Sequence, residues 1–363
     1  MHECHADVPQ RRIESRLLDR PRPAQRLLCA ALAVSVMTCG GRGKLATIAS
    51  DARDASVAEP ELYGAGLFST GFWDYFMAWS PDQRDVLFCR ATDDFTTFAI
   101  FETRLAPDGH WTAPTHPAFA TRWSNSDPHV SIDGSRVFFI SNRPLPGDTA
   151  RSARETYDIW YADREDGGTW GEAHHLDGPM NDPGGNEWSP AVAANGNLYF
   201  GSNRPAGGRG DQDIWRSRFV TGAYEAPENL GDSINTPGGE IEPWIAPDES
   251  YLLFSAARRT DSIGTYDLYI AERRDGVWQK ARPLARPINT GAWEFNPSVS
   301  PDGRWLYFSS TRAHSGALGP RFDWPPDDEH IRNIGNGKSG DIYRVPMSAV
   351  RSVLRQARSR GDD

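Results

Sequence analysis

Short runs of apolar and aromatic residues recur along most of the chain, about 50 to 60 residues apart. They occupy residues 86–88, 137–139, 198–200, 251–254 and 305–308. Each run follows a turn-forming tetrapeptide, of which Ser-Pro-Asp-Gly at 300–303 is the fullest example. Proline presets φ and glycine accepts a positive φ, so these tetrapeptides predict tight turns that join pairs of strands.

A second repeated feature follows each later run, an Asp-aliphatic-aromatic triplet that begins at Asp158, Asp213, Asp267 and Asp341. Asp-Gly pairs at 166–167 and 275–276 then predict hairpins. Each unit therefore reads as four short antiparallel strands. One four-stranded sheet cannot bury both of its faces, whereas five sheets stacked radially can, and that arrangement is a β-propeller.

The repeat has a recognisable signature: x-x-Pro before Ser-Pro-Asp-Gly, Leu-x-Phe-x-Ser-x-Arg after it, and then Asp-Ile-Tyr. It resembles the WD40-like (PD40-type) repeat of the periplasmic propeller TolB and its relatives, over residues 74–346. The resemblance implies an all-β propeller with a scaffolding or binding role in the cell envelope. TolB-type propellers have six blades, but this chain has five repeats. We therefore expect five blades of four antiparallel strands, with six blades as the alternative.

The segment before the first repeat predicts how the ring closes. Residues 67–74 are similar in sequence to residues 287–294. This similarity indicates the last strand of a blade and the loop after it, without the other strands of that blade. We expect residues 60–68 to supply the outer strand of the blade that begins at Glu294.

The start of the chain has the pattern of a targeting segment. Residues 1–26 are polar and rich in arginine, and the apolar stretch 27–38 is too short to span a membrane as a helix. Cys39 follows in a segment that resembles a bacterial lipoprotein box, which implies that Cys39 is lipidated. The alternative is a misassigned start and a cytosolic protein.

These features divide the chain into four expected parts. They are a signal segment at 1–39, a flexible linker at 40–59, the propeller at 60–350 and an Arg-rich tail at 351–363. The expected location is the periplasm, the outer membrane by a lipid anchor, or the exterior.

Charge limits the range of partners. The 363 residues carry 39 Lys and Arg against 49 Asp and Glu, a formal net charge of −10. An acidic chain without a dense basic run argues against nucleic acid, and membrane contact is expected only through the lipid anchor. After processing at Cys39, Cys89 is the remaining thiol, so no disulfide is expected within the domain. We expect a monomer.

Acidic residues recur where each innermost strand is expected to begin, on the face with the longer loops. We expect them to ring the mouth of an axial channel and to bind a cation, a sugar or a basic peptide terminus. The alternative is structural: each carboxylate accepts hydrogen bonds from loop amides or pairs with an arginine. The candidate binding residues are Asp74, Asp127, Glu187, Glu240, Glu242 and Glu294.

Tryptophans recur around the loops that connect the units. Exposed, they would stack on sugar rings or grip a peptide, and the alternative is packing between blades. The candidates for stacking are Trp73, Trp188, Trp244 and Trp293. We also expect Arg143 and its counterparts to pair with the triplet aspartates, as with Asp158, and so to lock strands together.

Patterns for catalysis are missing from the sequence, which has no G-x-S-x-G elbow, no H-E-x-x-H and no Walker loop. We therefore assign no catalytic residue, no cofactor and no metal site. The longest insertion does contain Asp327, Asp328, Glu329 and His330, which offer ligands for Ca²⁺. The alternative is a solvated acidic loop.

The leading hypothesis is a non-enzymatic envelope propeller that binds or scaffolds a protein or peptide through its loop-rich face. The resemblance to TolB implies this role; the residues alone do not. The alternative is a carbohydrate-binding or carbohydrate-active propeller, a lectin, glycoside hydrolase or lyase, that uses the acidic ring and the loop tryptophans. A third possibility is a propeller detached from a catalytic domain encoded elsewhere.

Overall fold

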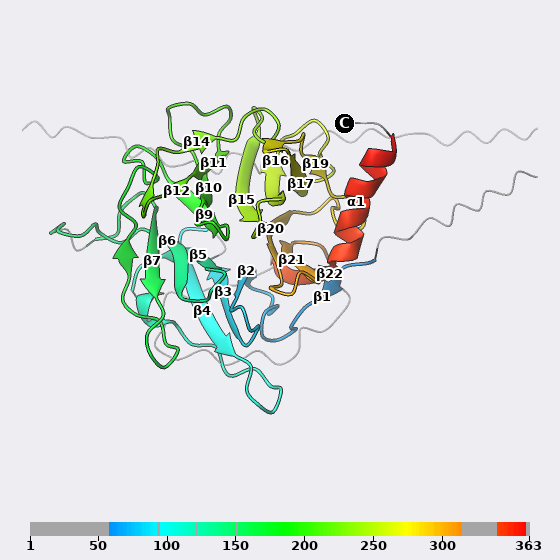
Figure 1. The fold of residues 1–363 in the computed structure, drawn as a ribbon. Helices are drawn as coiled ribbons and strands as arrows, with labels where there is room; N and C mark the ends of the chain where they lie inside the picture. Colours follow the sequence, from blue (N-terminus) through cyan, green and yellow to red (C-terminus); the bar gives the residue numbers. More distant parts are fainter. Residues whose placement is uncertain (1–57, 93–94, 121, 150–151, 314–339, 361–363) are drawn as a thin grey trace, which may run out of the picture. The chain divides into compact units, whose positions relative to one another are not determined.

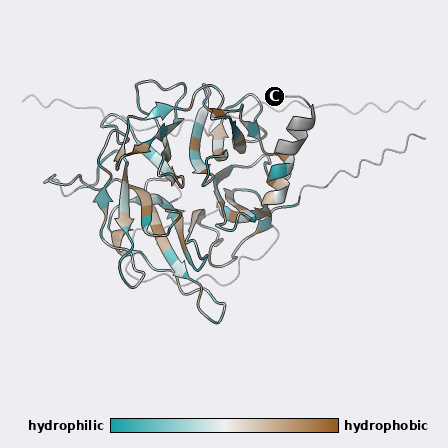
Figure 2. Cartoon of the chain, viewed as in Figure 1, coloured by the Kyte–Doolittle hydropathy of each residue, from teal (hydrophilic) through white to brown (hydrophobic). Residues whose placement is uncertain are grey.

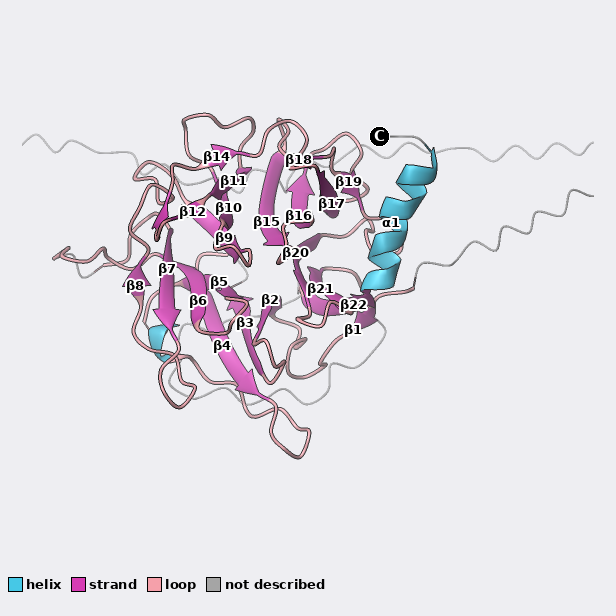
Figure 3. Cartoon of the chain, in the orientation of Figure 1, coloured by secondary structure: helices cyan, strands magenta, loops and turns pink. Residues whose placement is uncertain are grey.

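The fold is seen in a computed structural model that describes residues 58–92, 95–120, 122–149, 152–313 and 340–360. The chain divides into two units, residues 1–54 and 55–363, and the described residues all belong to the second. This unit consists of five antiparallel sheets around one axis, with strands as its main elements (Figures 1 and 3). The all-β, five-bladed propeller that the repeats predict is confirmed.

Each blade starts at the axis and proceeds outward. The innermost strands are β2 (Trp73–Trp79), β5 (Asn125–Val130), β9 (Glu187–Val192), β15 (Gly239–Ile245) and β20 (Glu294–Val299). The second strands are β3 (Asp85–Ala91), β6 (Arg136–Ser141), β10 (Leu198–Ser202), β16 (Tyr251–Ala257) and β21 (Trp305–Ser310). Blades 1 to 5 are numbered in this order.

The outer half of each blade completes the sheet. The third strands are β4 (Phe98–Arg104), β7 (Asp158–Asp163), β11 (Asp213–Ser217), β17 (Tyr266–Arg274) and β22 (Asp341–Pro346). The outermost strands are β8 (His174–His175), β14 (Glu228–Asn229), β19 (Arg282–Pro283) and β1 (Glu61–Leu62). Short additional elements are β12 (Phe219–Val220), β13 (Ala223–Tyr224), β18 (Val277–Trp278), the 3-10 helix η1 (Ala118–Ala120) and α1 (Met347–Arg360).

Blade 1 has three strands instead of the expected four. In place of a fourth strand, Thr115 exchanges two backbone hydrogen bonds with Glu102 of β4, at 2.9 and 2.7 Å. On one side Pro117 has no N–H to donate, so the ladder ends there. On the other side the contact with β4 resumes irregularly, where the Thr112 N–H donates to the Arg104 carbonyl at 2.8 Å.

The ring closes through the N-terminal strand, as predicted. β1 pairs with β22, with Glu61 opposite Arg344 and Leu62 opposite Tyr343, and so becomes the outer strand of blade 5. The Ser69 hydroxyl then accepts a hydrogen bond from the Ile342 N–H at 2.9 Å. The blade that starts at Glu294 is therefore completed by residues more than 200 positions earlier in the chain.

Every innermost strand is interrupted at the same place by a residue with left-handed backbone. These axial residues are Phe76, Asp127, Ser189, Glu242 and Asn296, with φ between 50° and 58°. The pairing with the second strand shifts register at each of them, which marks a β-bulge. Proline follows the axial residue in four blades. An innermost strand tolerates proline because its inner edge pairs with no other strand.

The core lies in the seams between blades. The second-strand residues Phe88, Phe139, Phe200, Phe254 and Phe308 are all buried. Tyr199 of blade 3 and Phe254 of blade 4, for example, share one buried cluster with Trp278. Hydrophobic bands lie along the strands while the connecting loops are largely hydrophilic (Figure 2). Burial of each such side chain stabilises the fold by roughly 1.5–3 kcal/mol, so the seams hold the ring together.

The chain continues from β22 directly into α1. Met347, Ala349 and Val350 are buried and join the cluster of Val345 and Leu306 in blade 5. The first turn of this helix is thus part of the propeller core. Within the described residues, none of the helices has the length and apolarity needed to cross a membrane.

Candidate functional site

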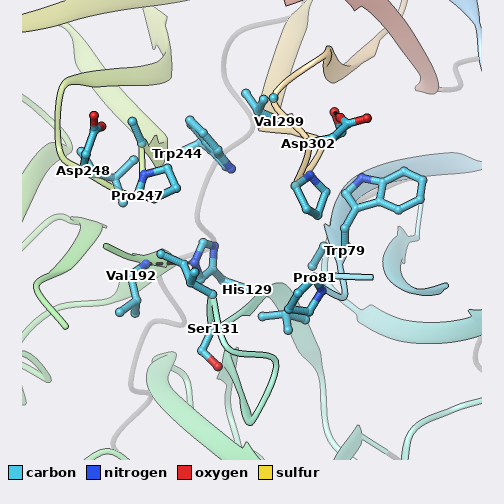
Figure 4. A pocket seen from close by; sticks show the side chains of 18 of the residues that line it. Trp79, Pro81, His129, Ser131, Val192, Trp244, Pro247, Asp248, Val299 and Asp302 are labelled. Atoms are coloured by element: carbon cyan, nitrogen blue, oxygen red, sulfur yellow. Dashed lines mark hydrogen bonds between the residues drawn. The ribbon is translucent and has the colours of Figure 1, made fainter. Parts of the chain in front are cut away.

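A cavity of about 630 Å³ lies at the end of the axis where the first and second strands of each blade are joined. All five blades line it with the ends of β2, β5, β9, β15 and β20 or with the turns that follow (Figure 4). Arg351 of α1 also lines it. The sequence led us to expect binding at the opposite, loop-rich face. The tight-turn face is therefore an additional candidate surface.

The walls of this axial cavity are mainly apolar and aromatic. Trp79 and Trp244 lie on different sides of it, and the ring of Tyr251 is 5.7 Å from that of Trp244 (Figure 4). The turns contribute Pro81 and Pro247. The indole N–H of Trp79 is buried without a hydrogen-bond partner. Such walls favour apolar groups of a ligand, with polar groups at the rim left to fix its orientation.

His129 adds an uncharged ring to the cavity wall. Its Nε2 accepts a hydrogen bond from the Val192 N–H at 3.0 Å, so the neutral ring carries its proton on Nδ1. Burial lowers the pKa of His129 to about 4. The histidine is therefore neutral at physiological pH and offers Nδ1–H as a donor.

The rim of the cavity carries negative charge. Asp248 and Asp302 lie in its wall, and the turn aspartates Asp82 and Asp133 occupy equivalent places in blades 1 and 2. A serine hydroxyl donates to each of these carboxylates, as Ser300 does to Asp302 at 2.6 Å. These hydrogen bonds lower the pKa of all four aspartates, so they are ionised at neutral pH. The rim favours a cationic group.

Four of the predicted acidic residues are buried where the innermost strands begin: Asp74, Glu187, Glu240 and Glu294. Thr290 donates its N–H at 2.8 Å and its hydroxyl at 2.7 Å to Glu294. Thr70 and Thr236 do the same for Asp74 and Glu240, and the Asp182 N–H donates to Glu187. The preceding loop folds over each carboxylate. This is the structural alternative, rather than an exposed ring at a channel mouth.

Arginines complete these networks. Arg204 donates to Glu187 at 3.2 Å, Arg259 to Glu240 at 3.2 Å and Arg312 to Glu294 at 3.1 Å. Arg90 pairs with Asp74 in blade 1. Burial raises the pKa of Glu187 to about 7 in spite of the opposing charge of Arg204. We call each carboxylate with its loop donors and arginine a latch.

The predicted pairing of Arg143 with Asp158 is wrong. Arg143 donates to Oδ1 of Asn125, the latch position of blade 2, at 2.7 Å. Asp158 instead pairs with Arg154 at 2.8 Å and with His175 Nε2 at 2.8 Å. The reason is packing: the Arg143 guanidinium lies over the rings of Phe139 and Trp160, and this stacking directs it inward along the blade.

Asp127 and Glu242, the other two predicted acidic residues, are axial residues. Asp127 accepts hydrogen bonds from the Ser189 N–H at 3.0 Å and the Ser189 hydroxyl at 2.8 Å. Glu242 accepts one from the Asn296 N–H at 2.7 Å. Each carboxylate thus binds the axial residue of the next blade. Burial, with repulsion from Asp127 as a smaller cause, raises the pKa of Glu242 to about 7.

The predicted stacking residues do not share one surface. Trp73 is buried at the seam between blades 5 and 1, with its ring 6.0 Å from that of Trp293. Trp188 packs against the cluster between blades 2 and 3. Trp244 lies near the far end of its strand and lines the axial cavity, so its expected place beside the loops was wrong. A strand of seven residues carries the side chain from one face to the other.

Other predicted residues lie outside the described part of the chain. They are Cys39 and residues 327–330. Among the described residues, no group of three or more His, Cys, Asp or Glu is placed to hold a metal ion.

The axial cavity itself was missed from the sequence. Its lining comes from five short segments, each separated by about 50 residues from the next. One usable signal was the turn proline, repeated as Pro81, Pro247 and Pro301. Identical turns on a closed ring must meet around its axis, so their side chains converge there.

The chain is similar to solved structures at low sequence identity. No protein-family model and no curated protein matches the chain. Similar solved structures include a TolB candidate from Agrobacterium tumefaciens, with 17% identity, a TM-score of 0.44, and coverage of 76% of this chain and 91% of the other. They include TolB from Acinetobacter baumannii, with 15% identity, a TM-score of 0.40, and coverage of 76% and 54%. This chain thus spans about half of that protein's length.

An enzyme is also among the similar structures. It is an alpha-L-arabinofuranosidase from Lactobacillus brevis, with 11% identity, a TM-score of 0.43, and coverage of 78% of this chain and 92% of the other. The propeller expected from the repeats is observed, with five blades. At these identities no activity or partner transfers to this chain.

Proposed function

We propose that this chain is a non-enzymatic binding propeller of the bacterial envelope that takes a protein or peptide segment in the axial cavity. The observation that carries the proposal is the composition of that cavity. Five blades bring two tryptophans, a tyrosine and three prolines around about 630 Å³, a volume within the range of ligand sites. Proline and aromatic walls suit apolar side chains of an extended segment.

The charge of the rim narrows the expected ligand. The ionised turn aspartates, including Asp248 and Asp302, favour a segment that carries Lys or Arg beside its apolar side chains. Arg351 and the neutral His129 add donors to the same wall. We therefore expect a basic-apolar peptide, and a weaker interaction as salt rises because the rim charges are exposed.

The test is selection of a displayed peptide library on the full chain, with a glycan array in parallel. Selected peptides are then titrated against Trp244→Ala and against the double variant Asp248→Asn/Asp302→Asn. We expect at least a tenfold weaker Kd for the first variant and a smaller salt dependence for the second. Val277→Ser is the matched control, because Val277 is 63% exposed and does not line the cavity.

Two results would contradict the proposal. Peptides that bind Trp244→Ala and the double variant as tightly as the parent chain would place the interface elsewhere, with the loop-rich face next to test. Binding of glycans but not peptides, lost in Trp244→Ala, would favour the carbohydrate-binding alternative. Thermal melting of each variant separates loss of binding from loss of fold.

A further inference from the structure

The loop-rich end of the axis carries a continuous arc of aromatic rings. Centroid distances are 5.6 Å for Tyr266 and Trp293, 6.0 Å for Trp293 and Trp73, and 4.6 Å for Trp73 and Phe95. The arc continues through Phe98 to Tyr157, whose rings are 5.8 Å apart. It therefore extends from blade 4 through blades 5 and 1 to blade 2. Blade 3 contributes no ring to it.

The arc follows from the repeat. The residue at the start of a third strand lies against the beginning of the innermost strand of the next blade. Tyr266, for example, forms an isolated parallel β-bridge with Trp293. Tyr157, Phe98 and Tyr266 occupy this crossing position in three blades. In blade 3 the crossing residue is Gln212, which bridges to Gly239 and leaves the arc open on that side.

Two carboxylates lie at the axis beside this arc. Asp127 and Glu242 belong to blades 2 and 4, which are not neighbours, so the charge repulsion between them acts across the axis. The same two charges contribute to raised pKa values of Tyr157 and Tyr266 in the arc, although burial is the larger cause.

Contacts connect both carboxylates to the arc. Ser126 donates to Asp127 and shares a hydrogen bond with the Tyr75 hydroxyl, and the Tyr75 ring lies 6.4 Å from Phe98 of the arc. Glu242 accepts from the N–H of Asn296, and the ring of the preceding Phe295 lies 6.3 Å from that of Trp73.

No cation of the described chain compensates these two carboxylates. Their hydrogen-bond partners are hydroxyls and backbone N–H groups, in contrast to the four latches, where an arginine is present. The Asn296 side chain also forms a hydrogen bond with Glu242. Asn296 is 3% exposed, and its Oδ1 has no hydrogen-bond partner. A buried acceptor without a donor is destabilising, and a ligand N–H at this place would satisfy it.

We propose that the loop-rich end of the axis binds one organic cation, an alkylammonium or guanidinium group, between the carboxylates of Asp127 and Glu242 and the aromatic arc. The carboxylates supply the opposite charge. The ring faces supply cation–π attraction, which is strongest for tryptophan and for a desolvated cation. Asn296 Oδ1 supplies a third acceptor for the N–H groups of the cation. This site lies at the opposite end of the axis from the cavity of the proposed function and is independent of it.

The test is isothermal titration calorimetry of the full chain with three probes: putrescine as a free amine, a Gly-Arg-Gly peptide amide, and CaCl₂ at matched ionic strength. The amine and the peptide distinguish a free cation from a side chain as the source of the group. We expect one organic cation per chain. We expect binding at least tenfold weaker in Asp127→Asn/Glu242→Gln and several-fold weaker in Trp293→Leu. Asp108→Asn is the control, since Asp108 is an exposed carboxylate of the other face.

Three outcomes would overturn the proposal. The first is that neither organic probe binds at millimolar concentration. The second is binding that the carboxylate variants leave unchanged. The third is binding of Ca²⁺ alone, lost in the same variants, which would make this a metal site. If the double variant fails to fold, Trp293→Leu and Tyr266→Leu test the proposal instead. Unchanged binding of the organic cation in both variants would show that the aromatic arc is not part of the site.

Discussion

Arg312 forms an ion pair at 3.1 Å with the buried Glu294 inside blade 5, and the same guanidinium lies 5.0 Å above the ring of Tyr343. It also donates to the backbone carbonyl of Pro287 at 3.1 Å. One arginine therefore joins the innermost strand, the third strand and the loop from the preceding blade. Asp74, Glu187 and Glu240 form equivalent latches in three other blades.

Breaking one latch should destabilise the propeller strongly. In Glu294→Ala the Arg312 charge and the Thr290 donors lose the carboxylate that they share, and we expect a loss of about 3–5 kcal/mol in the free energy of unfolding. Glu294→Gln keeps an acceptor and should cost less. Urea denaturation measures both. Asp163→Asn, which breaks an exposed pair with Arg136, is the control and should cost at most about 1 kcal/mol. Equal losses for the two pairs would contradict this account.

Ring closure should decide whether the domain unfolds cooperatively. Ser69→Ala leaves the buried Ile342 N–H without its acceptor, and we expect a loss of about 1–3 kcal/mol. A chain that begins at residue 71 also lacks β1 and exposes the edge of β22. We expect it to lose the single sharp transition in calorimetry. A chain that begins at residue 58 keeps β1 and is the control. An unchanged transition in the shorter chain would exclude closure as the source of cooperativity.

Two partly buried groups, Glu242 and His129, should give opposite pH dependences of stability. The folded pKa of Glu242 is about 7, above the usual 4.5, so its contribution is complete below pH 4.5 and is lost as pH rises through 7. The folded pKa of His129 is about 4, below the usual 6.5, so stability is lost as pH falls from 6.5 toward 4. Between pH 4.5 and 6.5, Glu242→Gln should make the slope of stability against pH more positive, and His129→Gln more negative.

Denaturation at closely spaced pH values measures these slopes. Two variants that shift the slope in the same direction would show that at least one of the two groups does not titrate as assigned. Asp166→Asn is a suitable control, because Asp166 is exposed and lies far along the chain from both groups.

Glu249 should resist replacement although its backbone is strained. Its φ is 56°, at the turn position where other blades have glycine, as at Gly303 with 68°. Its carboxylate accepts hydrogen bonds from the Tyr199 hydroxyl at 2.7 Å and from Arg273 at 2.6 Å, and so joins blades 3 and 4. Glu249→Gly relieves about 1 kcal/mol of strain but loses these bonds, and we expect a net destabilisation of about 1–3 kcal/mol.

The equivalent change in blade 1 is the matched control. Gln83 has a φ of 59° and is only partly buried, so Gln83→Gly should be neutral or slightly stabilising. Thermal denaturation compares the two glycine variants. A Glu249→Gly protein as stable as the parent would show that the contacts of Glu249 contribute little.

The sequence by itself determined the architecture of this protein. Turn tetrapeptides, aromatic runs and the echo of residues 287–294 in 67–74 gave five blades and their closure, because tandem local patterns repeat one supersecondary unit. The acidic residues were also found, but the sequence left two alternatives open for their surroundings: an exposed ring at a channel mouth, or contacts with loop amides and arginines. The local sequence predicts that Glu294 begins a strand. The burial of Glu294 depends on its contacts with Thr290 and Arg312, and these form only when the surrounding segments fold together.

Only the tertiary structure decided which surfaces are open to ligands. The axial cavity joins Trp79, Trp244 and their neighbours from segments about 50 residues apart, and the arc of Trp73, Trp293 and Tyr266 joins three blades. The sequence assigned Trp244 to the wrong face because a repeat reports spacing along a strand but not the end at which a side chain emerges. Closure of the ring brings equivalent positions together, and that convergence is a property of the whole fold.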